Sequence, residues 1–345
     1  MTDAADIGNL DPLAEELEAN IGGFHGLKSV SKFGTGQSNP TFRVEAESGT
    51  YVLRAKPPGK LLAGAHRVDR EFRVLAALAN TDVPVPQVLY LSPEDSALGR
   101  MYYVMRHVGG RIFWDPALPE LETPEDRAAI YDAMNLTLAE LHGVDVEAAG
   151  LADFGKPGNY FARQLERWSE NYRAAEVDRN DDVHALIDWL EKNLPPDDRT
   201  VALVHGDWRL DNMIFAADAP RVAAVLDWEL STLGHPLADL AYQCMAWRLP
   251  HGSGFRGMGG LDRAALGLPE ERAYVEAYCR RRGIGPVGGW DFHIAFAFFR
   301  LAAILQGVYK RALDGNASNP QKAREYGAAV PLLAELAVAV TREGA

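Results

Sequence analysis

Basic residues are scarce in this chain of 345 residues: 35 lysines and arginines stand against 48 aspartates and glutamates, for a formal net charge of -13. A nucleic-acid-binding surface needs a positive field to neutralise phosphates, so this balance argues against a nucleic-acid partner. Only two cysteines are present, Cys244 and Cys279, in apolar helical contexts without metal-ligand spacing. They are typical of reduced core residues in a cytosolic protein, and they exclude a disulfide framework.

Long apolar runs are also lacking. The longest, FHIAFAFFRLAAIL at residues 292–305, contains Arg300 and falls short of the roughly 18 residues that suggest a membrane span. It predicts a buried helix. The acidic N-terminus has neither the basic nor the apolar region of a signal peptide. We therefore expect a cytoplasmic protein with no membrane partner, whose oligomeric state the sequence does not set.

The order of the elements predicts two lobes, which the length of the chain also favours. Strand-like runs and one main helix occupy the N-terminal part, and long helices follow after VGGR at 108–111. This pattern indicates an α+β chain with an N-terminal lobe at 1–107 and a C-terminal lobe at 108–345. Strands are expected at 27–33, 41–46, 50–56, 87–91 and 101–108, and helices at 11–21, 66–79, 124–142, 158–174, 181–193, 236–247, 269–282 and 291–313.

One short stretch concentrates polar side chains between two strand-like segments. HGDWRLDNMI, residues 205–214, is followed by MIF, a turn and VAAVLD at 222–227, which read as a β-hairpin. Such a hairpin folds Asn212 back beside Asp227, and Asp207 lies on the same loop. Carboxylate and amide oxygens of this kind suit Mg²⁺. The spacing favours phosphoryl transfer, with Asp207 as the base and with Asn212 and Asp227 holding Mg²⁺ against nucleotide phosphates.

The motifs HGDWRLDNMI, VLDWE and HPLADLA, in this order, resemble the aminoglycoside phosphotransferase family, which phosphorylates small-molecule hydroxyls. FGTGQSNPTF, YVLRAKPPGKLL and YVMRHVGGRIF resemble the subgroup found alone in bacteria and fused to acyl-CoA dehydrogenases. The resemblance covers about residues 25–315. It implies a bilobal protein-kinase-like fold, whose N-terminal lobe has a five-stranded antiparallel sheet and one main helix. It also implies ATP and Mg as cofactors, a hydroxylated small-molecule acceptor, and the same roles for Asp207, Asn212 and Asp227.

The nucleotide-binding residues are predicted in the N-terminal lobe. FGTGQSNPTF lies between the first two strands, where the backbone amides of a kinase-like lobe contact nucleotide phosphates. Arg54 and Lys56 are two apart and share one strand face, so either could hold the phosphates; the resemblance favours Arg54. Glu71, at the flank of the buried helix face, is the expected partner of that cation. By resemblance, adenine meets the backbone near Tyr103 to Arg106. The candidates are Gly34, Thr35, Gly36, Ser38, Asn39, Arg54, Lys56, Glu71, Tyr103 and Met105.

The acceptor is predicted to be anionic. Residues 251–290 carry six arginines against four acidic residues, in a chain whose net charge is -13. Arg300 is a further cation in an apolar helix; its partner is either the substrate or a structural group. Together with the resemblance to domains fused to acyl-CoA dehydrogenases, this favours a hydroxylated metabolite such as a hydroxyacyl-CoA over a polycationic aminoglycoside.

Three other functions stay open. An antibiotic kinase that acts on aminoglycosides uses the same site with another acceptor. A dinuclear metal phosphohydrolase could use His205, Asp207, Asp227 and His235 as ligands, but it leaves Asn212 and the glycine-rich segment unexplained. A non-catalytic nucleotide-binding pseudokinase usually lacks the base or a metal ligand. In this chain the candidate base, Asp207, and both candidate metal ligands, Asn212 and Asp227, are present.

Overall fold

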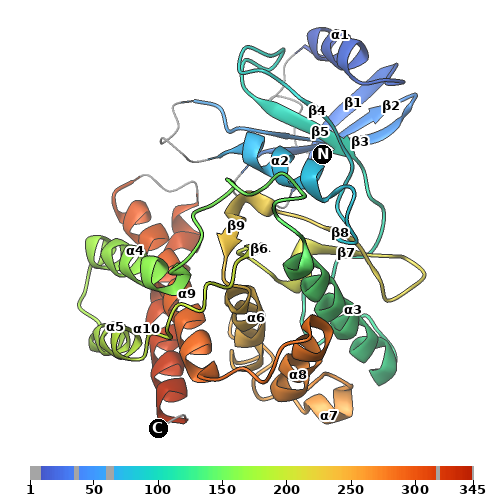
Figure 1. The fold of residues 1–345 in the computed structure, drawn as a ribbon. Coiled ribbons are helices and arrows are strands. Elements are labelled where there is room, and N and C mark those ends of the chain that lie inside the picture. The colour runs from blue at the N-terminus through green and yellow to red at the C-terminus, as the bar shows by residue number, and fades with distance from the viewer. Residues whose placement is uncertain (1–8, 35–38, 60–65, 316–318, 344–345) are drawn as a thin grey trace. The chain divides into compact units, whose positions relative to one another are not determined.

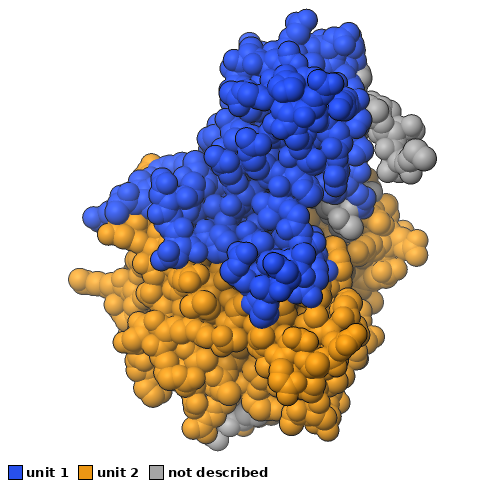
Figure 2. Space-filling model, turned by 90° about the vertical axis from the view of Figure 1, so that its right-hand side faces the viewer, with its two compact units in different colours: residues 1–112, 147–151, 212–231 blue, residues 113–146, 152–211, 232–345 orange. Residues whose placement is uncertain are grey.

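The computed structural model describes residues 9–34, 39–59, 66–315 and 319–343. The chain forms two compact units, coloured separately in Figure 2: unit 1 comprises residues 1–112, 147–151 and 212–231, and unit 2 comprises 113–146, 152–211 and 232–345. Unit 1 therefore includes a segment from far along the chain, which a boundary at residue 107 leaves out. The reason is that this segment pairs with the N-terminal part: Val225 donates to the Pro84 carbonyl, and Arg111 and Phe215 exchange two backbone hydrogen bonds of 2.8 Å.

Unit 1 is built on a five-stranded antiparallel sheet in the order β1-β2-β3-β5-β4 (Figure 1). Strand residues alternate between its two faces, so one set packs with α1 and the other faces α2. The predicted strands are confirmed to within two residues at each end. The elements are α1 (Asp11–Asn20), β1 (Leu27–Lys32), β2 (Thr41–Ala46), β3 (Gly49–Ala55), α2 (Val68–Leu78), β4 (Val88–Leu91) and β5 (Tyr102–Arg106). The buried cluster beside α1 includes Leu13, Leu17, Phe24, Phe42, Val44, Tyr51, Leu53, Tyr102 and Val104.

The predicted hairpin is also present in unit 1, as β7 (Met213–Phe215) and β8 (Val222–Val225). Its first pair joins Met213 to Val225, and the amide of Leu226 donates to the carbonyl of Asn212 at 2.8 Å. This pairing sets the backbone of Asn212 beside the residue that precedes Asp227. The chain at VGGR runs against the hairpin, and a Cβ added to Gly110 would lie 2.2 Å from the Phe215 carbonyl oxygen, so only glycine fits there.

Unit 2 is mostly helical. Its elements are α3 (Pro124–Gly143), α4 (Tyr160–Ala175), α5 (Asp181–Lys192), β6 (Ala202–Val204), β9 (Thr232–Gly234), α6 (Leu237–Cys244), α7 (Arg263–Leu266), α8 (Glu271–Arg282), α9 (Trp290–Leu313) and α10 (Pro320–Glu343). In Figure 1, α4, α5, α6 and α10 lie around α9. The α9 helix is long and apolar enough to cross a membrane, but 72% of its most apolar window is buried inside the protein. The prediction of a buried helix is confirmed.

The sequence analysis did not predict three elements of unit 2: the short α7, β9 and α10. The α10 helix contains Pro331, which removes a helical hydrogen bond and is usually taken as a breaker. It packs along α9 nevertheless, and Gly327 allows close approach, because an added Cβ would lie 2.4 Å from the Tyr309 ring. Strand β9 pairs with β6 over only three residues, so its pattern is too short to be distinctive.

Candidate active site

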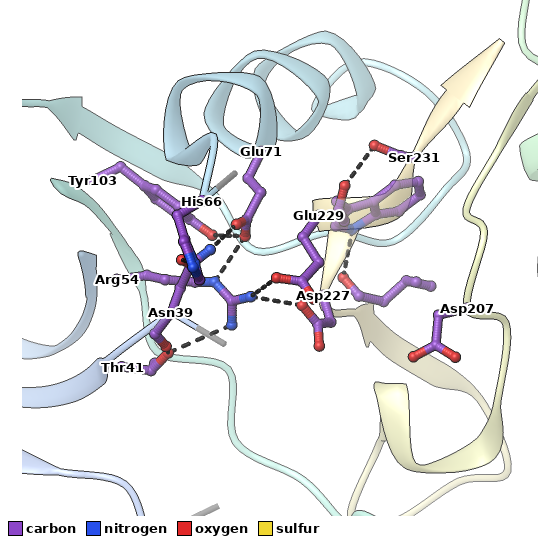
Figure 3. Close-up of polar contacts among 12 residues, drawn as sticks. Asn39, Thr41, Arg54, His66, Glu71, Tyr103, Asp207, Asp227, Glu229 and Ser231 are labelled. Carbon is purple, nitrogen blue, oxygen red and sulfur yellow. Dashed lines mark hydrogen bonds and ion pairs between the residues drawn. The ribbon is translucent and has the colours of Figure 1, made fainter. Parts of the chain in front are cut away.

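The first site residues lie in one row across the sheet of unit 1. The strand register aligns Thr41 of β2, Arg54 of β3 and Tyr103 of β5. Directly opposed residues share a face of a sheet, so the three side chains project together on the side of α2. Arg54 Nη1 lies 3.5 Å from Thr41 Oγ1 (Figure 3). The strand register and the contact with Thr41 thus fix the position of the Arg54 guanidinium on this face of the sheet.

Glu71 of α2 is the buried partner of Arg54. Its side chain is only 1% exposed, and Oε2 lies 2.8 Å from Arg54 Nε and accepts from the Tyr103 hydroxyl at 3.2 Å. Asn39 donates its Nδ2 to Glu71 Oε1 at 2.6 Å, while its own Oδ1 lies 2.9 Å from His66 Nδ1. The structure therefore brings together the predicted cation and its predicted helix partner. Glu71 lies within the buried face of α2, and not at its flank as expected.

Two further carboxylates contact the same guanidinium. Asp227 Oδ1 lies 2.6 Å from Arg54 Nη2, and Glu229 Oε2 lies 3.8 Å from it (Figure 3). Asp227 has a φ of 64°, in the left-handed region that residues other than glycine rarely adopt. Backbone strain of this kind persists only where the surroundings fix it, and it gathers at functional sites. Here the hairpin hydrogen bond of Leu226 supplies that constraint.

Negative charge is in excess around Arg54. One guanidinium faces the carboxylates of Glu71, Asp227 and Glu229, which leaves a formal charge of -2 when all are ionised. Burial raises the pKa of Glu71 from 4.5 to about 7; Arg54 opposes this shift, and the charges of Asp227 and Glu229 add to it. Burial by itself would lower the pKa of Arg54, but the carboxylates, Glu71 foremost, raise it. This excess of negative charge favours a further cation near Asp227.

The donor atoms also fit Mg²⁺. Asp227 offers a carboxylate, and the adjacent Asn212 is an amide residue that is 7% exposed. Mg²⁺ is usually held by one or two protein carboxylates with waters and substrate phosphates. Among the described residues, no group of three or more histidine, cysteine, aspartate and glutamate side chains is arranged to hold a metal ion. A magnesium site completed by phosphates needs no such group.

Replacing Arg54 with methionine should destabilise the protein by about 3 kcal/mol, because it leaves Glu71 as an uncompensated buried charge. We expect this loss to shrink as the pH falls from 7.5 towards 5. The pKa of Glu71 is raised in the folded state, so protonation favours the folded protein, and that contribution is lost as the pH rises through about 7. Denaturant unfolding at several pH values measures both effects.

Lys56 provides the matched control. It follows the end of β3, and its ammonium group pairs with Glu94, whose side chain is 62% exposed. Exposed ion pairs contribute at most about 1 kcal/mol, so Lys56→Met should change the free energy of unfolding by less than that. Equal losses in the two variants would contradict the buried role of Arg54.

The second group of site residues lies on the loop after β6, in unit 2. Asp239 of α6, which is 0% exposed, accepts from the backbone amides of His205 at 2.6 Å and of Gly206 at 2.8 Å. His142 Nε2 lies 3.3 Å from the same carboxylate. On the other side, Arg300 Nη2 donates to the Gly206 carbonyl at 2.7 Å. The loop before Asp207 is thus held from both sides, and the partner of Arg300 is this backbone carbonyl.

Asp207 itself is partly accessible, with 18% of its side chain exposed. Its Oδ2 lies 3.1 Å from Arg209 Nη2, and the hydroxyl of the half-buried Tyr242 also interacts with its carboxylate. Burial, reinforced by Asp207, raises the pKa of Tyr242, so this tyrosine stays a neutral donor. Asp207 therefore has a fixed orientation and remains open to a ligand, as a base that receives a substrate proton requires.

The other predicted nucleotide residues are placed as follows. Thr35, Gly36 and Ser38 lie outside the described residues, whereas Gly34 is described and exposed. Tyr103 and Met105 lie in β5, between β3 and β4, where the sheet pairing engages their backbone. The contact of Tyr103 and Met105 with a nucleotide stays a prediction.

A five-stranded antiparallel sheet with α2 against it, a helical unit, and the order Asp207, Asn212, Asp227 around a strand hairpin define a kinase-like fold. The family comparison agrees, since the profile of the phosphotransferase enzyme family matches residues 29–278. The chain belongs to this family, that of the aminoglycoside phosphotransferases, and is a small-molecule phosphotransferase by family and fold. The resemblance drawn from the motifs is confirmed.

Relatives at high identity include a solved chain that this chain covers almost completely and longer proteins that it covers in part. A crystal structure from Ralstonia eutropha, described as a candidate aminoglycoside phosphotransferase, is 45% identical, with a TM-score of 0.89 over 97% of this chain and 98% of that one. Acyl-CoA dehydrogenase family member 10 of Mus musculus is 47% identical over 94% of this chain, and probable acyl-CoA dehydrogenase IBR3 of Arabidopsis thaliana is 45% identical over 95%. The chain spans only 30% and 42% of those two proteins.

More distant structures share the fold alone. A choline kinase from Cryptosporidium parvum aligns with a TM-score of 0.66 at 13% identity, over 97% of each chain.

Sequence reasoning missed several residues that the structure adds to the site: His66 beside Asn39, Tyr242 beside Asp207, and the pairing of Arg209 with Asp207. His66 and Tyr242 carry no local signal, because their contacts join residues 27 and 35 positions apart.

Proposed function

We propose that this protein is an ATP- and Mg²⁺-dependent O-phosphotransferase that acts on a hydroxyl group of an anionic small molecule such as a hydroxyacyl-CoA. The observation that supports the proposal is the arrangement around Arg54, where one cation and three carboxylates leave an excess of negative charge. A structural neighbour, spectinomycin phosphotransferase, was solved with ADP, and this supports ATP as the phosphoryl donor.

The residues have separate tasks in this proposal. Asp227 and Asn212 would hold Mg²⁺, which would supply positive charge against the nucleotide phosphates. Arg54, kept in place by Glu71, contacts the phosphates. Asp207 orients the acceptor hydroxyl and accepts its proton, and the clamp of Asp239 and Arg300 on the preceding loop keeps Asp207 in position.

The acceptor is proposed from two further observations. The relatives named as acyl-CoA dehydrogenase family members carry a segment similar to this chain, which supports an acyl-CoA substrate. The arginine-rich segment after residue 250 favours an anion over a polycationic aminoglycoside, whose ammonium groups need carboxylate partners. A dinuclear hydrolase is less well supported, because His235 faces Asp198 at 3.4 Å and His205 Nδ1 accepts from the backbone of Asp207.

A screen for ADP release tests the proposal. Purified protein with MgATP is supplied with hydroxyacyl-CoA esters, free hydroxy acids, choline, sugars and kanamycin, and we expect turnover with the hydroxyacyl-CoA esters. Omitting Mg²⁺ or replacing ATP with phosphate esters provides the controls. Turnover of kanamycin alone would exclude the anionic acceptor, and hydrolysis of phosphate esters without nucleotide would exclude phosphoryl transfer from ATP.

A further inference from the structure

Two arginines of unit 2 share one buried carboxylate next to Asp207. Arg209 Nη2 lies 3.5 Å from Asp211 Oδ2, and Arg256 forms an ion pair with the same oxygen. The Asp211 side chain is only 5% exposed, whereas those of Arg209 and Arg256 are 42% and 37% exposed. A buried carboxylate is therefore shared by two arginines whose side chains are partly exposed, although Arg209 Nε and Arg256 Nη1 are themselves buried. Although Asp207 and Asp211 balance their charge, two neighbouring guanidiniums can donate paired, charge-assisted hydrogen bonds to an anionic group.

An exposed aromatic ring extends this pair. The guanidinium carbon of Arg256 lies 4.8 Å from the centre of the Trp114 ring, and Trp114 is 45% exposed. Stacking keeps the planar guanidinium in one orientation, and it leaves much of the large apolar surface of Trp114 open to solvent. Exposed tryptophan beside arginine is a combination enriched at binding sites.

The segment that carries Arg256 has a well-defined backbone. Pro250 and Gly259 form a parallel bridge, and the amide of Met258 donates to the Ala246 carbonyl at 2.7 Å. A Cβ on Gly257 would lie 2.0 Å from the carbonyl oxygen of Leu249, so this close contact requires glycine beside Arg256. The position of Arg256 is therefore set by the fold of unit 2 before any ligand binds, which reduces the entropy lost on binding.

Arg209 links the pair to the candidate base, because the same Nη2 atom lies 3.1 Å from Asp207 Oδ2 and 3.5 Å from Asp211 Oδ2. We propose that Arg209 and Arg256 bind an anionic group of the acceptor, that Trp114 covers an adjoining apolar or planar part, and that this contact sets the acceptor hydroxyl against Asp207. The assignment rests on the proposed phosphotransferase function. Arg256 takes the substrate-binding role that the sequence analysis gave to Arg300, since Arg300 is buried and donates to the Gly206 carbonyl.

The anionic group is a phosphate or a carboxylate, and the test distinguishes them. Binding of coenzyme A and of free 3-hydroxybutyrate is measured by calorimetry, and turnover of 3-hydroxybutyryl-CoA is measured by ADP release. Coenzyme A binding alone identifies a phosphate contact, and 3-hydroxybutyrate binding alone identifies a carboxylate contact. Because calorimetry needs no turnover, it tests the arginine pair even if no acceptor is phosphorylated, in which case only the proposed function fails.

The decisive variants are Arg256→Gln, Arg256→Lys and Trp114→Ala, with Arg272→Gln as the control because its side chain is 91% exposed on α8. Loss of charge-assisted hydrogen bonds in Arg256→Gln should raise the KM for 3-hydroxybutyryl-CoA, and the Kd of the probe that binds, by about 10- to 100-fold. Arg256→Lys should give a smaller rise, since it keeps the charge without the planar fork. Trp114→Ala should also raise KM, and the KM for MgATP should stay within about twofold in all variants.

Other results overturn the assignment. If KM and the probe Kd are unchanged in Arg256→Gln, or if kcat falls without a change in KM, Arg256 only braces its loop on Asp211. If neither coenzyme A nor 3-hydroxybutyrate binds the unmodified protein, the arginine pair does not recognise these anions and the proposal is wrong.

Discussion

Asp207→Ala should lower kcat by about a thousandfold while the Kd for MgATP stays within about threefold, because a general base contributes on the order of 10²–10⁴ to the rate. The phosphate and metal contacts proposed here come from unit 1, through Arg54, Asn212 and Asp227, whereas Asp207 belongs to unit 2 and contacts Arg209 and Tyr242. Stopped-assay ADP release measures kcat, and isothermal titration measures MgATP affinity.

The control for Asp207→Ala is Asp188→Ala, which removes an exposed carboxylate from α5 in the same unit. It should retain full turnover. Asp207→Asn adds a shape-preserving variant that keeps the contact with Tyr242 but cannot accept a proton. Substantial turnover in Asp207→Asn would show that the hydroxyl proton leaves by another route, and the assignment of Asp207 as base would fail.

Asp227→Asn should remove the gain in ATP affinity that Mg²⁺ provides. Asparagine tolerates the left-handed backbone of residue 227, so this variant loses the charge without new strain. Titration of ATP with Mg²⁺ and with EDTA should show a Mg²⁺-dependent gain that is at least about tenfold smaller than in the unmodified protein. Turnover should fall by about a hundredfold or more, because one of the few protein ligands of the ion is lost.

Asp218→Ala is the matched control in the same hairpin, since Asp218 is exposed in the turn between β7 and β8. It should leave both titrations unchanged. If Asp227→Asn binds MgATP as the unmodified protein does, the metal contacts other residues and the reading of the -2 charge around Arg54 is wrong.

The parts of this protein that the sequence predicted are those in which the pattern is local. The strand-like composition of TFRVEA and YVLRA is enough to predict β2 and β3. The helical spacing of Val68 and Leu75 is enough to place Glu71 near the buried face of α2, although it was expected at the flank of that face. The hairpin of residues 213–225 follows from two short apolar runs and a polar turn. The two-residue period could not separate Arg54 from Lys56, because β3 ends between them, at Ala55, and Lys56 then meets Glu94.

The contacts that support Asp207 could not be predicted, because they join distant positions. Arg300 and Gly206 are 94 residues apart, and Asp239 and His205 are 34 apart. From a single sequence, an arginine within an apolar helix is expected to have a polar partner, but the sequence does not identify that partner. The same reason hid the ion pair of Arg256 with Asp211, which depends on how a long irregular segment folds back.

The hairpin that carries Asp227 has a consequence for how the protein forms during synthesis. Most of unit 1 comes from residues 1–112, but it is complete only when residues 212–231 emerge, since Phe215 pairs with Arg111 and Val225 with Pro84. Until then a nascent N-terminal lobe has unpaired backbone groups at these two places, and Arg54 and Glu71 face each other without Asp227. A ribosome must therefore deliver residues 113–146 and 152–211, nearly half of unit 2, before unit 1 can be completed, so unit 1 does not finish folding before the synthesis of unit 2 is well advanced.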